Sequence, residues 1–214
     1  MTMSMKNELI LTRAYPVLPV IVIEELSQAV PLAKALSAGG IHVFEVTLRT
    51  VCALEAIQEI KAAMPDCITG AGTVTSPDQI EAVLKAGADF AVSPGATPAL
   101  LKEAFQQKLA LIPGVSTPSD VIQAMEHGYN LLKLFPAEQS GGINMLKALA
   151  GPFPDIRFCP TGGIGLHNAK EYLALNNVAA IGGSWICPAN LVQSKDWGAI
   201  TQLATQAISS LKKT

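Results

Sequence analysis

The sequence has few cysteines and few histidines, and neither residue type forms a metal-binding pattern. Four cysteines and three histidines occur in 214 residues, and no C-x-x-C or H-x-x-x-H spacing is present. Structural zinc sites and redox motifs usually show such spacings. We therefore expect no metal or other cofactor, and ordinary reduced thiols at Cys52, Cys67, Cys159 and Cys187.

Charged residues and long apolar runs are also scarce. Charged residues make up 15% of the chain, the net charge is −2, and the basic residues are scattered. This pattern disfavours a nucleic-acid partner. The most apolar run, residues 17–23, contains Pro19 and is far shorter than the roughly 20 residues of a membrane span. Because residues 1–6 also lack the features of a signal peptide, we expect a cytoplasmic protein with no membrane partner.

Apolar residues are abundant, at 50% of the chain, which is enough for the core of one domain spanning residues 1–214. Short apolar runs alternate with amphipathic stretches, which is typical of βα units on a parallel sheet. The eight runs are residues 17–23, 42–47, 67–71, 90–93, 109–113, 131–135, 157–161 and 179–182. Eight units favour a closed (β/α)₈ TIM barrel over the alternative, an open doubly wound sheet.

Hydroxyl residues followed by proline mark the expected starts of three helices. Ser76-Pro77, Thr97-Pro98 and Thr117-Pro118 each place an N-cap before a proline at the first helical position. At helix ends, glycine supplies the left-handed residue that turns the chain toward the next strand; we expect this of Gly39-Gly40, Gly87 and Gly128. A last helix is predicted at about residues 197–212.

One predicted strand carries a lysine, Lys133, among large apolar residues. Strand alternation puts Lys133 on the same face as Leu131 and Phe135. If that face is the barrel interior, burial favours the neutral amine, which can attack a ketone to form an imine. The alternative is an outward lysine whose stem extends past a helix to water.

The second predicted strand carries polar residues on one face. Glu45, Thr47 and Arg49 share that face by the period of two. Active sites of parallel barrels lie at the carboxyl ends of the strands, where this carboxylate and guanidinium fall. The alternative is a structural ion pair without a catalytic role.

Glycines at several predicted strand ends would let a ligand approach the backbone. Thr73 follows Gly70-Ala71-Gly72 and puts a hydroxyl at the rim. Thr161-Gly162-Gly163 and Gly182-Gly183-Ser184 follow the last two strands, where barrels often bind phosphate through backbone N–H groups. Pro94 and Pro113 bring no acid, base or thiol, so we interpret them as pocket walls.

Seven motifs, in order and at barrel spacing, resemble those of the 2-keto-3-deoxy-6-phosphogluconate (KDPG) and 4-hydroxy-2-oxoglutarate (KHG) aldolase family. The motifs are EVTLRT at residues 45–50, GAGTV at 70–74, SPG at 93–95, IPG at 112–114, KLFPA at 133–137, PTGGI at 160–164 and GGSW at 182–185. The resemblance covers residues 16–188.

The resemblance implies a class I aldolase that needs no metal and acts on a phosphorylated 2-keto acid. It implies that Lys133 forms the imine and that Glu45 is the general acid and base. Arg49 and Thr73 would hold the substrate carboxylate. The other expected substrate-binding residues are Pro94, Phe135, Thr161, Gly162, Gly163 and Ser184.

The resemblance also implies a homotrimer, and it leaves alternative activities open. The nearest alternative is a 2-keto-3-deoxy-6-phosphogalactonate aldolase, which shares the mechanism. A sugar-phosphate isomerase or epimerase would use the same phosphate loops and a glutamate base, but it would leave Lys133 without a task. A non-catalytic barrel that binds phosphorylated metabolites would need no grouping of lysine, glutamate and arginine.

Overall fold

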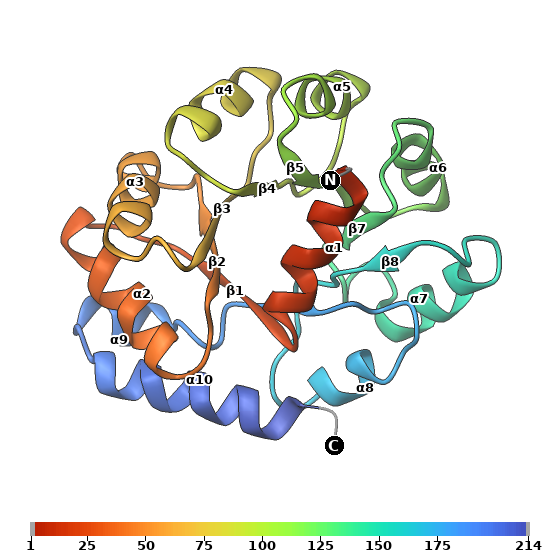
Figure 1. Ribbon diagram of the computed structural model, residues 1–214. Coiled ribbons are helices and arrows are strands. Elements are labelled where there is room, and N and C mark those ends of the chain that lie inside the picture. Colours follow the sequence, from red (N-terminus) through yellow and green to blue (C-terminus); the bar gives the residue numbers. More distant parts are fainter. Residues whose placement is uncertain (1–2, 213–214) are drawn as a thin grey trace.

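Parallel strands form a closed ring, and helices surround it (Figure 1). The structure is a computed structural model that describes residues 3–212. The strands are β1 Val17–Ile21, β2 Val43–Thr47, β3 Ile68–Gly72, β4 Phe90–Val92, β5 Ala110–Ile112, β6 Gly114–Val115, β7 Leu131–Leu134, β8 Arg157–Phe158 and β9 Ile181–Gly183. The helices are α1 Met3–Ala14, η1 Leu26–Gln28, α2 Ala29–Ala38, α3 Ala53–Ala63, α4 Pro77–Lys85, α5 Pro98–Gln106, α6 Pro118–Glu126, α7 Gly142–Ala150, α8 Ala169–Leu173, α9 Ala189–Gln193 and α10 Trp197–Leu211.

Two sets of hydrogen-bonded strands make up the ring. Their orders are β5-β4-β3-β2-β1-β9 and β6-β7-β8, and all paired strands are parallel. β5 and β6 are two halves of one strand, so the two sets join there. At the opposite seam, single parallel bridges link Phe158 to Val178 and Thr161 to Gly182. The ring therefore has eight strand positions, which confirms the expected (β/α)₈ barrel.

Proline shortens two of the expected strands. The run 109–113 is interrupted at Pro113, and the run 157–161 keeps regular pairing only over Arg157–Phe158, two residues before Pro160. Proline has no N–H to donate to a neighbouring strand, so the ladder breaks at such positions. Thr161, after Pro160, returns to the ring through its bridge to Gly182.

Each of the three predicted helix starts is observed. Ser76 and Thr117 form capping boxes with Gln79 and Asp120, and the Thr97 hydroxyl accepts a hydrogen bond from a backbone N–H of α5. These boxes satisfy N–H groups that a helix start otherwise leaves unpaired. At helix ends the chain turns through glycines with positive φ, namely Gly40, Gly87 and Gly128. The predicted last helix is α10. No helix within residues 3–212 combines the length and the apolarity of a membrane span.

Helix α1, which the sequence pattern did not predict, closes the amino-terminal end of the barrel. Its residues Ile10, Leu11 and Ala14 are buried. They join an apolar cluster with side chains near the starts of several strands, namely Leu18, Val43, Phe90, Ala110 and Leu131. In Figure 1, α1 lies within the circle of outer helices, across the ring of strands. The interior of the barrel near its amino-terminal end is therefore filled in part by a helix that does not belong to the βα repeat.

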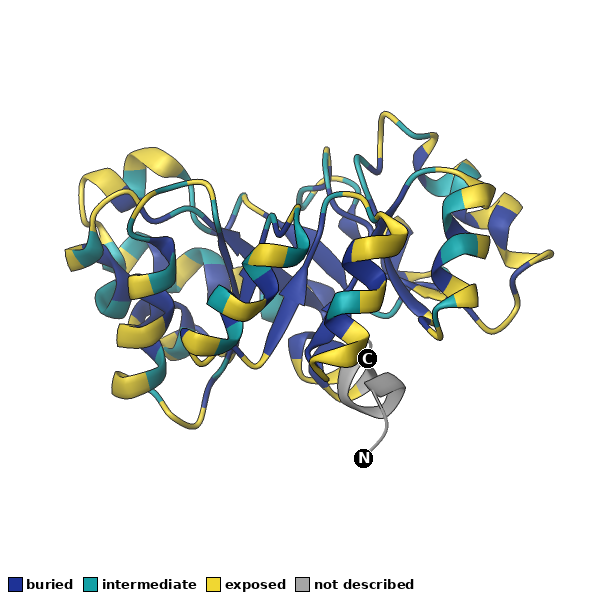
Figure 2. Cartoon of the chain, turned by 90° about the horizontal axis from the view of Figure 1, so that it is seen from above, coloured by how far each residue is buried: buried dark blue, intermediate teal, exposed yellow. Residues whose placement is uncertain are grey.

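The strand wall separates this inner cluster from a second apolar core. The second core lies between the strands and the outer helices, and it includes Phe44 and Val46 of β2 and Leu132 and Leu134 of β7. Figure 2 shows most strand residues as buried and the outer faces of the helices as exposed. Alternate residues of each strand therefore face opposite cores.

This alternation decides where the ionisable strand residues lie. Val43 and Leu131 belong to the inner cluster, so Glu45 and Lys133, two residues further along their strands, also face the barrel interior. The interior is thus apolar near its amino-terminal end and polar near its carboxyl end. The expected inward orientation of Lys133 is confirmed.

The packing of α1 gives a first prediction. Leu11 is fully buried, whereas Leu9 of the same helix is 47% exposed. We expect Leu11→Ala to lower the free energy of unfolding by about 2–5 kcal/mol, because it leaves a cavity inside the barrel. Leu9→Ala is the matched control, expected to change it by less than about 0.5 kcal/mol. Urea unfolding measures both, and equal losses would contradict the role given to α1.

Candidate active site

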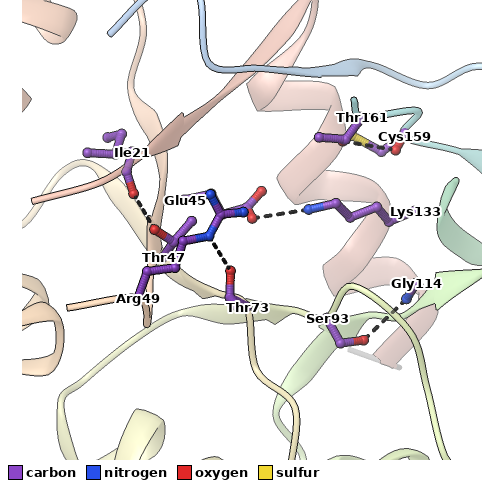
Figure 3. Close-up of polar contacts among 10 residues, drawn as sticks. All are labelled: Ile21, Glu45, Thr47, Arg49, Thr73, Ser93, Gly114, Lys133, Cys159 and Thr161. Carbon is purple, nitrogen blue, oxygen red and sulfur yellow. Dashed lines mark hydrogen bonds and ion pairs between the residues drawn. The ribbon is translucent and has the colours of Figure 1, made fainter. Parts of the chain in front are cut away.

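The centre of the site is an ion pair inside the barrel. The Lys133 Nζ atom of β7 donates a hydrogen bond to the Glu45 Oε1 atom of β2 at 3.3 Å (Figure 3). The two residues are 6% and 1% exposed. Burial of two charged groups is unfavourable unless they pair, so each residue requires the other. The arrangement brings a primary amine and a carboxylate together across the barrel at the carboxyl ends of the strands.

Glycine at position 72 makes room for the carboxylate. Gly72 pairs with Thr47 across β2 and β3, and the Glu45 side chain lies over its Cα. A Cβ atom at Gly72 would collide with Glu45 Oε1, Cγ and Cδ. The Lys133 Nζ atom also lies over the Phe135 ring, 5.3 Å from its centroid. That ring face favours a cationic nitrogen.

Arg49 and Thr73 lie at the rim, after β2 and β3. The Arg49 Nε atom donates a hydrogen bond to the Thr73 hydroxyl at 3.3 Å (Figure 3). Thr73 has a φ of 60°, a left-handed conformation that is uncommon for a threonine. Its backbone is thus held in a strained state that directs the hydroxyl toward Arg49. The guanidinium itself is exposed and keeps further donors for a carboxylate.

Thr161 and Cys159 line the barrel beside the amine. The Thr161 hydroxyl donates to the Cys159 carbonyl at 3.4 Å, and Gly182 lacks a Cβ that would collide with that hydroxyl. Burial raises the pKa of the Cys159 thiol to about 12; Lys133 lowers it and Glu45 raises it by smaller amounts. Cys159 is therefore a protonated, neutral neighbour of the pair and does not compete with Lys133 as a nucleophile.

Pro94 forms part of the wall between β4 and β6. Its backbone lies against Gly114, where a side chain would collide with it. The buried Ser93 hydroxyl accepts a hydrogen bond from the Gly114 N–H at 3.2 Å. These contacts fix the half-buried Pro94 ring at the edge of the site.

The Gly162-Gly163 loop presents free amide groups at the same end of the barrel. The Thr161 and Gly162 carbonyls accept hydrogen bonds from the Ala137 and Glu138 N–H groups at 2.8 and 3.2 Å. In a trans peptide the N–H points away from the C=O, so the Gly162 and Gly163 N–H groups point the other way. Within residues 3–212 these two N–H groups have no hydrogen-bond partner. Such amides favour an anion.

Ser184 lies at the rim after β9. It is exposed, and it lines a cavity of about 500 Å³ together with Val20, Trp185 and Val192. The Trp185 ring packs over Gly183, where a Cβ would collide with it. The structure therefore gives the two glycine loops different surroundings: the first is tied to the β7 loop, and the second borders an apolar cavity.

The structure thus brings Lys133 into contact with both Glu45 and Phe135 and joins Arg49 to Thr73. It also adds two residues that the sequence analysis did not place in the site, Ser93 and Cys159. Thr47 donates a hydrogen bond to the Ile21 carbonyl at 2.8 Å inside the barrel. The Cys159 side chain lies near the pair, and its alternation with the predicted site residue Thr161 could have placed it there. No group of three or more potential metal ligands is found within residues 3–212.

A parallel barrel whose carboxyl end holds a buried lysine against a carboxylate has the features of the class I aldolases, which are lyases. The chain belongs to the KDPG and KHG aldolase family, whose family model matches residues 8–203. It is 55% identical over 202 residues to the 2-dehydro-3-deoxy-phosphogluconate aldolase of Dickeya dadantii, with 94% of each chain covered. It is 52% identical over 197 residues to the KHG/KDPG aldolase of Escherichia coli K12, with 92% of each chain covered.

A solved structure of the same family superposes closely. The KDPG aldolase of Legionella pneumophila matches with a TM-score of 0.91 and 50% identity, covering 93% of this chain and 96% of that one. That crystal structure contains pyruvate captured at low pH as a covalent carbinolamine intermediate. The KDPG aldolase of Zymomonas mobilis ZM4 with 3-phosphoglycerate also has a TM-score of 0.91, at 45% identity and 98% coverage of both chains.

The contact between Gly72 and Glu45 gives a second prediction. In Gly72→Ala the new methyl group displaces the carboxylate from Lys133, so we expect aldolase activity to fall at least about tenfold. Gly151→Ala is the control, because a Cβ at Gly151 meets open space and its φ is −68°. Steady-state assays with circular dichroism of both variants measure the effect. Full activity of a folded Gly72→Ala protein would contradict the assignment.

Proposed function

We propose that this chain is a class I aldolase that cleaves 2-keto-3-deoxy-6-phosphogluconate to pyruvate and glyceraldehyde 3-phosphate. It also cleaves 4-hydroxy-2-oxoglutarate to pyruvate and glyoxylate. The observation that carries this proposal is the contact between Lys133 Nζ and Glu45 Oε1 inside the barrel. The names of its relatives, KDPG aldolase and KHG/KDPG aldolase, support both substrates.

The proposed reaction begins at Lys133. Glu45 takes a proton from the Lys133 ammonium, and the resulting neutral amine attacks the C2 ketone. Glu45 then moves protons as the carbinolamine loses water to become a protonated imine. The C4 hydroxyl then gives its proton to the Glu45 carboxylate, and the C3–C4 bond breaks. The electron pair of that bond moves into the imine and forms an enamine, while C4 leaves as an aldehyde. Glu45 returns that proton to C3 of the enamine, and water hydrolyses the resulting imine, which releases pyruvate and returns the lysine.

The remaining residues hold the two ends of the substrate. Arg49 and Thr73 bind the carboxylate, because a guanidinium can donate two parallel hydrogen bonds to it. Phe135 and Pro94 pack against the keto acid, and Thr161 contacts the aldehyde portion. The phosphate binds at the amides of the Gly162-Gly163 loop and at the exposed Ser184 hydroxyl.

We also propose that the chain forms a homotrimer in the cytoplasm as a single domain. The proposal of self-association is supported by large apolar side chains on the adjacent helices α5 and α6: Phe105, Ile122 and Met125 are 55%, 49% and 44% exposed. Four free cysteines are typical of a reducing compartment.

Light scattering coupled to size exclusion tests the trimer. We expect a mass three times the 22.4 kDa of one chain. The double variant Phe105→Glu/Met125→Glu places charges on that surface and is expected to shift the mass toward that of one chain. A wild-type mass of 22.4 kDa would disprove the homotrimer.

Borohydride trapping tests the chemistry. We expect incubation with pyruvate and borohydride to give a reduced pyruvyl adduct confined to Lys133, located by peptide mass spectrometry. Lys133→Met should abolish the adduct, because it keeps the chain length and removes the amine. Lys147→Met, at an exposed lysine of α7, should leave the adduct unchanged. Wild-type protein without an adduct would overturn the proposed function.

A further inference from the structure

We propose that Glu138, Asn168 and Tyr172 form a clamp that positions the Gly162-Gly163 loop for phosphate and so sets the preference for phosphorylated substrates. The three residues come from the loop after β7, the N-cap of α8 and α8 itself. The inference rests on the proposed function for the identity of the phosphate loop, and its test is separate from imine formation.

Asn168 is the centre of the clamp. Its Nδ2 atom donates to the Gly163 carbonyl at 3.1 Å, and its Oδ1 atom accepts from the Gly165 N–H at 2.9 Å. One amide group therefore ties the loop on both sides of Ile164. Because the carbonyl requires a donor and the N–H requires an acceptor, these two partners fix which way the side-chain amide faces.

The hydrogen bond to Gly163 completes a row of three tethered carbonyls. The carbonyls of Thr161 and Gly162 are held by the backbone N–H groups of Ala137 and Glu138. With the third carbonyl held by Asn168, the N–H groups of Gly162, Gly163 and Ile164 all project away from the tethers. Within residues 3–212, none of the three N–H groups has a hydrogen-bond partner. The clamp thus creates a third amide donor, at Ile164, beside the two glycines.

Glu138 is hydrogen-bonded to Tyr172, and the same carboxylate lies against Asn168. The Tyr172 hydroxyl donates a hydrogen bond to Glu138 Oε1, and Asn168 Nδ2 reaches the same oxygen at 3.5 Å. Tyr172 is fully buried, and burial together with the Glu138 carboxylate raises its pKa, so it remains a donor. The Glu138 side chain also packs against Gly163, where a Cβ would collide with it. The positive φ values of 106° and 76° at Gly162 and Gly163 match this close approach.

The arrangement has a specific functional consequence. A loop whose carbonyls are tied binds an anion without first losing conformational freedom, which strengthens binding. A 4-hydroxy-2-oxoglutarate molecule has no phosphate, and its second carboxylate is attached directly to C4, three atoms short of the phosphorus of the other substrate, so it gains less from the loop. Glu138, Asn168 and Tyr172 are positioning residues that act on one of the two proposed substrates.

The test compares Asn168→Ala with the control Asn176→Ala, at an exposed asparagine after α8. Titration calorimetry with 3-phosphoglycerate measures phosphate binding, and kcat/KM is measured for both substrates. We expect Asn168→Ala to weaken 3-phosphoglycerate binding and to raise KM for the phosphorylated substrate by about fivefold or more. Its kcat/KM for 4-hydroxy-2-oxoglutarate should stay within about twofold of wild type, as should all values for Asn176→Ala.

Variants at Glu138 give an independent comparison that also serves if Asn168→Ala does not fold. Glu138→Ala should reproduce the selective loss, whereas Glu138→Gln keeps an acceptor for Tyr172 and should retain most of the phosphate affinity. Equal losses for the two substrates, unchanged 3-phosphoglycerate binding in both alanine variants, or no binding by wild type would overturn the clamp. Failure of pyruvate trapping with a selective loss of phosphate binding would refute the aldolase proposal and keep the clamp.

Discussion

The buried pair of Lys133 and Glu45 is the interaction on which the arrangement of the carboxyl end of the barrel depends. Two ionisable groups are removed from water, and removing either partner would leave an uncompensated charge. The surrounding residues make room for the pair and bring no further charged group into contact with it. Gly72 leaves space for the carboxylate, Phe135 lies under the amine, and the nearby Cys159 thiol stays neutral. The polar centre is thus enclosed by groups that add no further charge inside the barrel.

The two ends of the proposed substrate are recognised by different kinds of chemistry. The carboxylate would meet side chains, Arg49 and Thr73, whose positions depend on a strained backbone after β3. Apart from the Ser184 hydroxyl, the phosphate would meet backbone amides, whose directions depend on where the carbonyls of the same loop are bound. Side-chain recognition can be changed by one substitution at the contact. Backbone recognition is changed only through the residues that hold the loop.

Much of the barrel could be predicted from the sequence because its signals are local. The caps at Ser76, Thr97 and Thr117 and the period of two in the strands act over a few residues, and the structure confirms them. The inward faces of Glu45 and Lys133 follow from that period. Helix α1 escaped prediction because its apolar face is defined only by the finished barrel end. The clamp escaped because Glu138 and Tyr172 are 34 residues apart in sequence.

The barrel interior has a lower level at its amino-terminal end, which α1 closes, and an upper level at its carboxyl end. Side chains from α1 and the strand starts fill the lower level with apolar packing, whereas the reacting groups occupy the upper level. Substitutions that improve packing below the Lys133–Glu45 pair therefore offer a route to a more stable enzyme that leaves its chemistry intact. The same division makes the lower level the safer region in which to redesign this barrel, because added stability there can offset losses incurred when the upper level is altered for new substrates.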